Sequence, residues 1–551
     1  MPSSKFDELL ARLGTGRWNY LCFLAVAYWN MHLVPHTLAG AFLAPKVDYT
    51  CHLPEEGYTI TSTLVNEADG SRSNDTNHCE YFAKSTDNGG GFVTHPCKSW
   101  VYDNSTYTST ITSEFDLICP YNYLRATYQS MYMFGTFVGA PLNGILSDRY
   151  GRKTMLSIGT TLFALIAIGS SWIPDFSAIL VSRFLLGLLH PVVIQTGYIL
   201  AMEVCEPRHR SVVGIILALP WAIATMLWGG VAYFIRDWRW LQTAVSLSGI
   251  LISPVLWFMD ESPRWLIVEG KFERANKVLR RAARWNKVTL PPQEELNALM
   301  RTIQGESAFA KQQAVQDQQE TSGCRQKSLY YIKRLFILFR TPKLRKITII
   351  VYLKFLLVNL VFYGLALNAV NYSADPFVYM VLGGLAEVPA YTVTAPIVAA
   401  FGRRVPSILL YLLSGASIFA VSFISPSLSW LVMTLAMVGK MCISAAFQLL
   451  YLYCTELFPT EVRLQALGSA TIASRIGSMT SPFITELLGP LYPRAPSILF
   501  GISAFVAGIA TIPLHETLGR PLPDTITELE NPEIQEPEEP DEETEMSKLR
   551  A

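Results

Sequence analysis

The sequence has no excess charge of either sign and few charged residues altogether. Its 551 residues include 44 Lys and Arg against 44 Asp and Glu, and charged residues make up 16% of the chain. Nucleic-acid-binding domains carry a strong positive excess, so the balance here excludes that class. The chain also lacks the phosphate-binding motif G-x-x-x-x-G-K and the nucleophile-elbow motif G-x-S-x-G. ATP-driven pumping and elbow-type hydrolysis therefore have no support, and we expect no enzyme.

Sequence patterns of metal centres are also missing. None of the nine cysteines belongs to a C-x-x-C pair, and no cluster of His and Cys has the spacing of metal ligands. His32 and His36 are four residues apart and share a helix face, but two histidines alone do not predict zinc. We expect neither a metal nor a cofactor.

Hydrophobic residues are abundant, at 50% of the chain, and they gather in runs of the length that crosses a bilayer as a helix. The first run follows an amphipathic lead without a small-residue cleavage site, so it predicts a retained helix and not a signal peptide. The sequence therefore predicts an all-α membrane protein. Twelve runs begin near Tyr20, Arg125, Thr154, Phe176, Ser211, Leu241, Lys346, Pro376, Val405, Leu431, Leu464 and Ser497.

Loop composition predicts the orientation. Residues 260–345 are rich in Lys and Arg, whereas residues 44–124 contain few, so the first segment should face the cytoplasm and the second the outside. The outer segment also carries glycosylation sequons at Asn74 and Asn104. Its four cysteines predict two disulfides, for which the sequence allows three pairings. They are Cys51, Cys79, Cys97 and Cys119.

These observations divide the chain into seven segments, with both ends in the cytoplasm. The segments are a cytoplasmic N-terminus (1–19), helix 1 (20–43), an extracellular loop (44–124), helices 2–6 (125–259), a cytoplasmic loop (260–345), helices 7–12 (346–514) and an acidic disordered tail (515–551).

An internal repeat relates the first six helices to the last six. Glu203 and Arg210 are matched by Glu456 and Arg463 at the same offset, since 456 − 203 and 463 − 210 are both 253. The turn 151–153 is matched by 402–404, and Glu261 by Glu516, at similar offsets. Duplication of a six-helix unit explains these matches.

Several motifs resemble one transporter family. The stretch G-I-L-S-D-R-Y-G-R-K (144–153) resembles the loop between helices 2 and 3 of the major facilitator superfamily. D-E-S-P-R-W-L (260–266), Y-L-Y-C-T-E-L-F-P-T-E-V-R (451–463) and the four-cysteine loop resemble the organic cation, carnitine and organic anion transporter family. The resemblance covers nearly the whole chain.

Shorter motifs are most similar to the carnitine and zwitterion branch of that family. They are A-Y-F-I-R-D-W-R, A-E-V-P-A-Y, V-G-K and A-S-R-I-G-S. H-P-V-V-I-Q-T-G-Y in helix 4 and Lys354 in helix 7 depart from that branch, which leaves the substrate open.

The resemblance implies two six-helix halves with the substrate bound between them near the midplane. Arg475 is expected to clamp a carboxylate, and aromatic faces to hold a quaternary ammonium group. Glu387 either joins this site or pairs structurally, for example with Lys354. The candidate substrate-binding residues are Gln195, Trp221, Tyr363, Glu387, Tyr391, Phe447, Gln448 and Arg475.

The 144–153 turn is expected to act in gating. Gly144 should let two helices approach closely, and Gly151 should let the backbone reverse. Charged residues of each half are expected to form a cytoplasmic latch that holds the outward-open state. They are Asp148, Arg152, Glu203 and Arg210 in the first half, and Arg403, Arg404, Glu456 and Arg463 in the second.

The resulting hypothesis is a secondary transporter of small organic ions in the plasma membrane, taking carnitine-like zwitterions or organic cations by alternating access. An organic anion exchanger is the alternative within the class, and a non-transporting receptor or scaffold is the alternative outside it. The expected partners are the substrate ion, the lipid bilayer and a coupling ion or exchange substrate.

Overall fold

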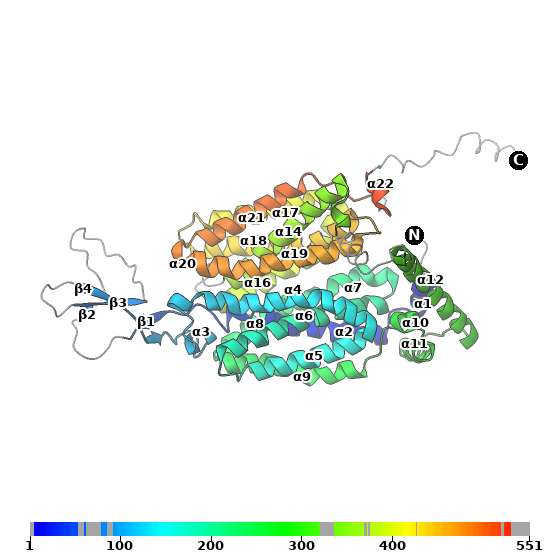
Figure 1. Ribbon diagram of the computed structural model, residues 1–551, viewed down its shortest axis with the longest axis horizontal. Coiled ribbons are helices and arrows are strands. Elements are labelled where there is room, and N and C mark those ends of the chain that lie inside the picture. Colours follow the sequence, from blue (N-terminus) through cyan, green and yellow to red (C-terminus); the bar gives the residue numbers. More distant parts are fainter. Residues whose placement is uncertain are drawn as a thin grey trace.

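Twelve membrane helices in two halves form the body of the protein (Figure 1). The computed structural model describes residues 5–52, 60–61, 79–84, 92–319, 336–368, 372, 375–425, 427–519 and 523–530. The N-terminal half contains α2 (Arg17–Thr37), α4 (Tyr123–Tyr150), α5 (Arg152–Ser170), α6 (Phe176–Val204), α7 (Arg210–Ile216) with α8 (Leu219–Phe234), and α9 (Trp238–Phe258). The C-terminal half contains α14 (Pro342–Leu367), α16 (Pro376–Phe401), α17 (Arg404–Val421), α18 (Ser429–Leu457), α19 (Arg463–Phe483) and α21 (Ala495–Thr511).

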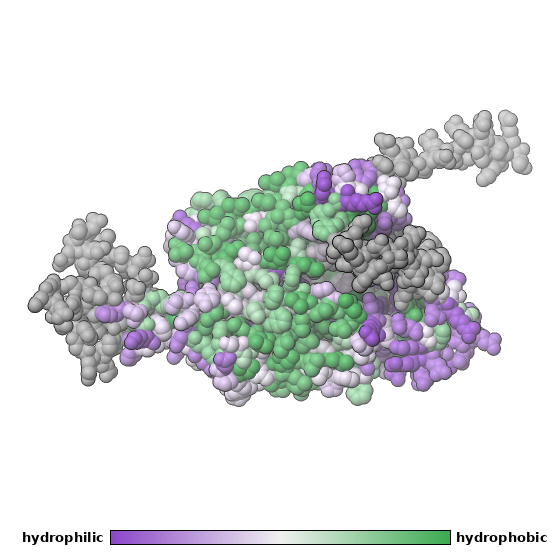
Figure 2. All heavy atoms as spheres, in the orientation of Figure 1, coloured by the Kyte–Doolittle hydropathy of each residue, from purple (hydrophilic) through white to green (hydrophobic). Residues whose placement is uncertain are grey.

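The helices have the length and surface of membrane spans. In the described part of the chain, eight helices are long and apolar enough to cross a bilayer, with α7 and α8 counted as one span. The helices α2, α4 and α19 are also long enough but more polar, and α21 has 17 residues. Figure 2 shows a broad hydrophobic surface across the visible face of these helices, with many hydrophilic residues gathered at the end that carries α10, α11 and α12. The predicted twelve-helix membrane fold is confirmed.

The two halves pack by the same rules. In the first half α5 packs against α6 and α9, and α2 packs against α8. In the second half α17 packs against α18 and α21, and α14 packs against α19. Each pair of the first half has a counterpart in the second half when α2 is matched with α14, α5 with α17, α6 with α18, α8 with α19 and α9 with α21. A duplication of six helices requires such a match.

The extracellular loop forms the end drawn on the left of Figure 1. Strand β1 (Tyr49–Cys51) pairs antiparallel with β5 (Trp100–Tyr102), and β3 (Glu80–Lys84) lies between β2 (Ile60–Thr61) and β4 (Phe92–Pro96). The short helix α3 (Ile111–Glu114) leads back toward the membrane. Disulfides join Cys51 to Cys97 and Cys79 to Cys119, which confirms two bridges and selects one of the three pairings.

The two predicted sequons differ in what can be said of them. Asn104 is exposed, beside a turn in which Asp103 accepts a hydrogen bond from the backbone N–H of Ser105 at 2.9 Å. An exposed turn is accessible to glycosylation, so Asn104 remains a predicted acceptor. Asn74 lies outside the described residues.

A group of helices covers the opposite, cytoplasmic end of the N-terminal half. It consists of α1 (Lys5–Leu13), α10 (Pro263–Val268), α11 (Phe272–Asn286) and α12 (Gln293–Gln319). Hydrophobic residues of α1 and α11 are buried between the helices, while the charged residues face outward. Residues 515–519 and α22 (Ile526–Glu530) lie on the C-terminal half, where Glu530 accepts a hydrogen bond from the backbone N–H of Lys343 at 2.9 Å. The segment 515–551 is therefore ordered at its start, unlike the predicted fully disordered tail.

Candidate functional site

Arg475 and Tyr363 meet in the interior of the C-terminal half. Arg475 lies on α19 and is half-buried, close to the buried Tyr363 of α14. The Nε atom of Arg475 is buried without a hydrogen-bond partner among the described residues. No described carboxylate lies within 4 Å of this guanidinium, so it can still accept an anionic group.

The small residues beside Arg475 serve helix packing. A Cβ on Gly477 would lie 2.1 Å from the backbone oxygen of Leu356 in α14. Ser474 and Ser478 are also buried. The sequence ASRIGS therefore brings α19 against α14, and this close approach places Arg475 next to Tyr363.

Glu387 forms an ion pair within the C-terminal half, but not with the expected lysine. Its carboxylate lies 3.4 Å from Nζ of Lys440 on α18, and both side chains are buried. Tyr391, one turn along α16, is also buried and lies near Glu387. Lys354 instead donates a hydrogen bond to Ser407 at 3.2 Å and lies over two tyrosine rings. The suggested pair of Glu387 with Lys354 is wrong.

Space for Lys440 depends on a glycine of the neighbouring helix. A Cβ on Gly383 of α16 would lie 2.4 Å from Nζ of Lys440. The motif VGK indicates a paired or functional lysine, because a charged residue inside a membrane helix is costly. Lys440 is nevertheless absent from the predicted site residues.

The remaining predicted residues lie in both halves. Phe447 of α18 stacks on Phe362 at 5.7 Å between ring centroids and contacts Tyr451 edge to face. Trp221 of α8 is half-buried and packs against the cluster that contains Tyr391. Gln448 is half-buried on α18, and Gln195 of α6 accepts a hydrogen bond from Asn143 at 3.4 Å. Gln195 thus lies in a polar contact inside the first half.

The N-terminal half contributes polar residues that the sequence did not single out. Tyr132 of α4 and His190 of α6 are hydrogen-bonded at 2.9 Å, and Arg475 lies near enough to act electrostatically on both. The guanidinium of Arg183 lies 4.6 Å from the ring centroids of Tyr128 and Tyr132, and donates to the backbone oxygen of His36. A polar cluster of the first half therefore faces the arginine of the second.

His32 and His36 belong to this interior. Their rings are 5.3 Å apart and both pack against Phe163. The described residues contain no group of three possible metal ligands.

The cytoplasmic charges of the N-terminal half form a smaller network than expected. Arg152 lies 2.9 Å from Asp148 and 3.4 Å from Glu203. Arg210 does not join them, because its guanidinium pairs with Asp7 of α1 at 2.6 Å. Gly151 has φ = +99° and a Cβ there would lie 2.4 Å from the carboxylate of Glu261, so the turn requires glycine.

The C-terminal half repeats this arrangement. Arg403 makes two hydrogen bonds to Glu456, at 2.8 and 2.9 Å. Glu516 accepts from the backbone N–H groups of Arg403 and Arg404 at 2.8 and 2.9 Å. Arg404 donates its side chain to the backbone oxygen of Ile512, and Arg463 donates to that of Phe458 at 3.3 Å. Arg404 and Arg463 are thus outside the predicted carboxylate network.

The halves contact each other toward the extracellular end, along a surface that we call the outer seam. Ser130 of α4 donates to the backbone oxygen of Met479 of α19, and Arg125 forms an ion pair with Glu486. On the other side of the bundle, a Cβ on Gly384 of α16 would lie 2.7 Å from the backbone oxygen of Ala222 in α8. Toward the extracellular end, the ring of Phe377 stacks on the ring of Phe42 with 5.3 Å between the centroids.

Further contacts surround Phe377. Tyr107 of the extracellular loop lies 5.7 Å from its ring centroid, and Tyr233 lies at the same distance in an edge-on orientation. The guanidinium of Arg236 lies 5.8 Å from the ring. At the cytoplasmic end, by contrast, Gly144 has no atom within 4 Å of its Cβ position, so the expected close helix contact is absent. These contacts between the halves therefore lie toward the extracellular end, and the helix contact expected at Gly144 does not add to them.

Comparisons with known proteins agree with this architecture. Residues 92–528 match the family described as sugar (and other) transporter. The organic cation transporter protein of Drosophila melanogaster is 30% identical over 534 residues, covering 96% of this chain and 94% of that protein. Organic anion transporter 3 of Homo sapiens is 31% identical over 529 residues, covering 96% and 94%. The inward-open xylose transporter XylE from E. coli has the same fold, with a TM-score of 0.60 at 16% identity over 93% and 98% of the two chains.

Proposed function

We propose that this chain carries carnitine-like zwitterions across the plasma membrane by alternating access. The chain belongs to the sugar (and other) transporter family of the major facilitator superfamily. Its relatives include organic cation and organic anion transporters. It is a multi-pass membrane protein and a transporter of small organic ions. Three features are proposed: the kind of ion that is carried, the membrane in which the protein lies and the residues that bind the substrate.

The observation that carries the proposal is the charge balance around Arg475. Glu387 and Lys440 form a pair and neutralise each other, whereas no described carboxylate lies within 4 Å of Arg475. A buried charge is costly unless it is paired, so a substrate carboxylate would provide the missing counterion. Two parallel hydrogen bonds from the guanidinium fit that group.

Aromatic rings near this arginine support the second half of the proposal. Phe362, Phe447 and Tyr451 form a cluster on α14 and α18, and Tyr363 is next to Phe362. A quaternary ammonium group contacts such ring faces at about 0.5–2 kcal/mol without needing a carboxylate partner. A zwitterion would therefore place its carboxylate at Arg475 and its ammonium group on the rings.

An organic anion exchanger is the second candidate, and the same arginine favours it. An organic anion would use Arg475 and would replace the ammonium contact by apolar contact with the rings. Organic cations without a carboxylate fit less well, because they would approach Arg475 without a described countercharge.

The pairs Arg152–Glu203 and Arg403–Glu456 belong to the proposed gating. We assign them, with Asp148, to the cytoplasmic surfaces that meet when the protein opens outward. Their contribution must be a few kcal/mol at most, because the equilibrium between the two states has to remain reversible.

Uptake measurements on the Arg475→Ala variant test which class of substrate the protein carries. A betaine-type zwitterion, an organic anion and a quaternary cation are compared in reconstituted vesicles, with and without sodium. Loss of a charge-assisted hydrogen bond costs about 1.5–3 kcal/mol, so carboxylate substrates should weaken about ten- to a hundredfold while the cation is unaffected. Arg475→Lys is the matched control for charge without the planar fork.

Each other outcome has a defined meaning. Equal loss for all three substrates would make Arg475 structural and remove the basis of the proposal. Loss confined to the organic anion would favour the exchanger. Absence of uptake for all three by the wild-type protein would contradict transport of these ions.

A further inference from the structure

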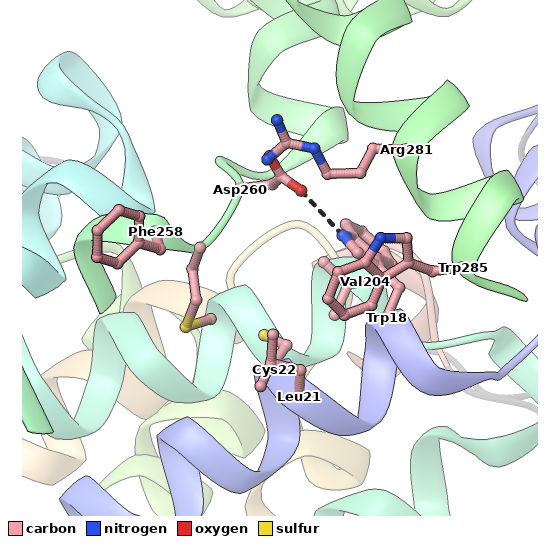
Figure 3. Close-up of a pocket in the computed structure, with 9 residues that line it drawn as sticks. Trp18, Leu21, Cys22, Val204, Phe258, Asp260, Arg281 and Trp285 are labelled. Atoms are coloured by element: carbon pink, nitrogen blue, oxygen red, sulfur yellow. Dashed lines mark hydrogen bonds and ion pairs between the residues drawn. The ribbon is translucent and has the colours of Figure 1, made fainter. Parts of the chain in front are cut away.

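A small pocket opens at the cytoplasmic boundary of the membrane, away from the proposed substrate site (Figure 3). It lies between the start of α2, the end of α9 and α11, and encloses about 60 Å³. Its lining is mostly apolar and aromatic, with one acidic and one basic side chain. The residues are Trp18, Leu21, Cys22, Val204, Phe258, Met259, Asp260, Arg281 and Trp285.

The rim of this pocket is apolar and exposed. Phe258 is 83% exposed and Trp285 is 45% exposed, and Leu21 is also exposed. Leu21 lies near the start of α2, Phe258 at the end of α9 and Trp285 near the end of α11. In a membrane protein such side chains contact lipid, and tryptophan favours the headgroup level. The pocket therefore opens toward the inner leaflet.

Its polar side is built around Arg281. Nη1 of Arg281 donates to Asp260 at 2.8 Å, and the indole N–H of Trp18 donates to the same carboxylate at 3.1 Å. The carboxylate fixes the guanidinium, whose side chain stays 56% exposed, at the pocket opening (Figure 3). Asp260 cancels the charge of Arg281, so attraction for an anion must come from further cations.

Neighbouring cations provide that attraction. Lys277 and Arg284 are exposed and lie four residues before and three residues after Arg281, so they share its face of α11. Arg17 is exposed at the start of α2, beside the pocket residue Trp18. Three exposed cations therefore lie within one helical turn of residues that line the pocket, and Glu273, four residues before Lys277, is an exposed acid on the same face of α11.

We propose that this pocket binds the headgroup phosphate of an acidic phospholipid of the inner leaflet. The phosphate would lie against Arg281 with Lys277, Arg284 and Arg17 around it. The acyl chains would follow the exposed apolar surface of Leu21 and Phe258. Phosphate and planar guanidinium match in geometry, and basic residues at the cytoplasmic surface attract anionic lipids. The continuous apolar rim favours a lipid over a free anion, which would gain nothing from it.

Native mass spectrometry of the purified full-length protein tests this inference. Phosphatidylglycerol and phosphatidylcholine are added at equal concentration, and bound lipid is counted. The variant Lys277→Gln/Arg284→Gln should weaken phosphatidylglycerol binding by about fivefold per cation, roughly twenty-five-fold in total, and leave phosphatidylcholine unchanged. Arg281→Gln should also weaken it, but it leaves Asp260 without its partner, so the double variant decides the test if that protein does not fold.

Arg280→Gln is the matched control. Arg280 is an exposed arginine of the same helix, but it bonds to Asn276 and to Gln293 of α12, on another face. Its removal should leave lipid binding unchanged. The inference is overturned if Arg280→Gln weakens binding as much as the double variant, since attraction would then be diffuse. It is also overturned if wild type binds both lipids equally, or if millimolar inorganic phosphate displaces phosphatidylglycerol completely.

Discussion

The extracellular and cytoplasmic ends of this protein are held together by different kinds of contact. At the outer seam, side chains of one half contact the other half, as Arg125 does with Glu486 and Phe42 with Phe377. At the cytoplasmic end, Arg152 and Arg403 each pair with a glutamate of their own half. The outer contacts need the two halves to touch, whereas the inner pairs do not. The proposed alternating access would use this difference, because only the outer contacts would be lost when that side opens.

Gly384→Val should break the outer seam and have the largest effect. The Cβ position of Gly384 lies 2.7 Å from the oxygen of Ala222 and 2.8 Å from the nitrogen of Met226. Both are backbone atoms, so a larger side chain must separate α16 from α8, at a cost of about 3 kcal/mol or more. Uptake should fall about a hundredfold or more, and thiol labelling of a cysteine placed at position 222 should increase from outside.

Gly144→Val is the matched control, because the Cβ position of Gly144 has no atom within 4 Å in this state. It should not open the outer seam. If both variants increased labelling from outside to the same extent, general loosening would explain the result and the comparison between the ends would fail.

Glu486→Gln should weaken the outer seam to a smaller extent. The side chain of Arg125 is 4% exposed, and it would keep its charge after losing its partner. Hydrogen bonds to charged groups contribute about 1.5–3 kcal/mol, so the closed state should lose about tenfold or more in population. Labelling at the outer seam measures that shift. A double variant with Arg125→Met should recover part of it, and failure to recover would contradict a direct pair.

Features that repeat along the chain could be predicted from the sequence. The turns at Gly151 and Gly402, and the glutamates Glu261 and Glu516 that bind them, appeared as matched positions before any contact was known. A repeat reports on contacts inside one half, since each half folds in the same way. Arg403 and Glu456, which were expected in one network of the second half, are hydrogen-bonded within that half.

Contacts that depend on helix rotation or on conformational state could not be predicted in this way. Whether Glu387 faces Lys354 or Lys440 depends on how α14 and α18 are turned, and both lysines lie in apolar runs. Arg210 pairs with Asp7, from a lead segment that had no repeat partner to compare. The outer seam is a contact between the two halves that is proposed to change during transport. A hydropathy pattern reports which segments are apolar, and it does not report which residues of the two halves meet.

Neutralising Asp148 or Arg152 should act on the inner end, with a moderate effect. Asp148 is 74% exposed in this state, whereas Arg152 is 15% exposed and also pairs with Glu203. An exposed pair contributes about 0.2–1 kcal/mol, so loss of the Asp148 charge should slow turnover by up to about fivefold while substrate affinity is preserved. Loss of the Arg152 charge removes both pairs and should slow turnover more. Transport kinetics and equilibrium substrate binding separate the two quantities. Normal turnover with lost affinity would place these residues in the substrate site and contradict a gating role.

Glu516→Gln should have the smallest effect on transport, because Glu516 binds α17 within one half. Burial alone would raise the pKa of Glu516, but backbone N–H donors of residues 403, 404, 517 and 518 hold the pKa below its ordinary value of 4.5. A lowered pKa in the folded state means that the charged form stabilises the fold above about pH 4.5, and that this stabilisation is lost as the pH falls further.

The Glu516→Gln variant should lose about 0.5–2 kcal/mol of folding free energy at pH 7. In thermal unfolding of the purified protein, the difference from wild type should shrink below pH 4.5, and outer-seam labelling should not change. A difference that persisted at pH 3 would show that the carboxylate charge is not the cause, and increased labelling would show that the inner contacts do reach across the halves.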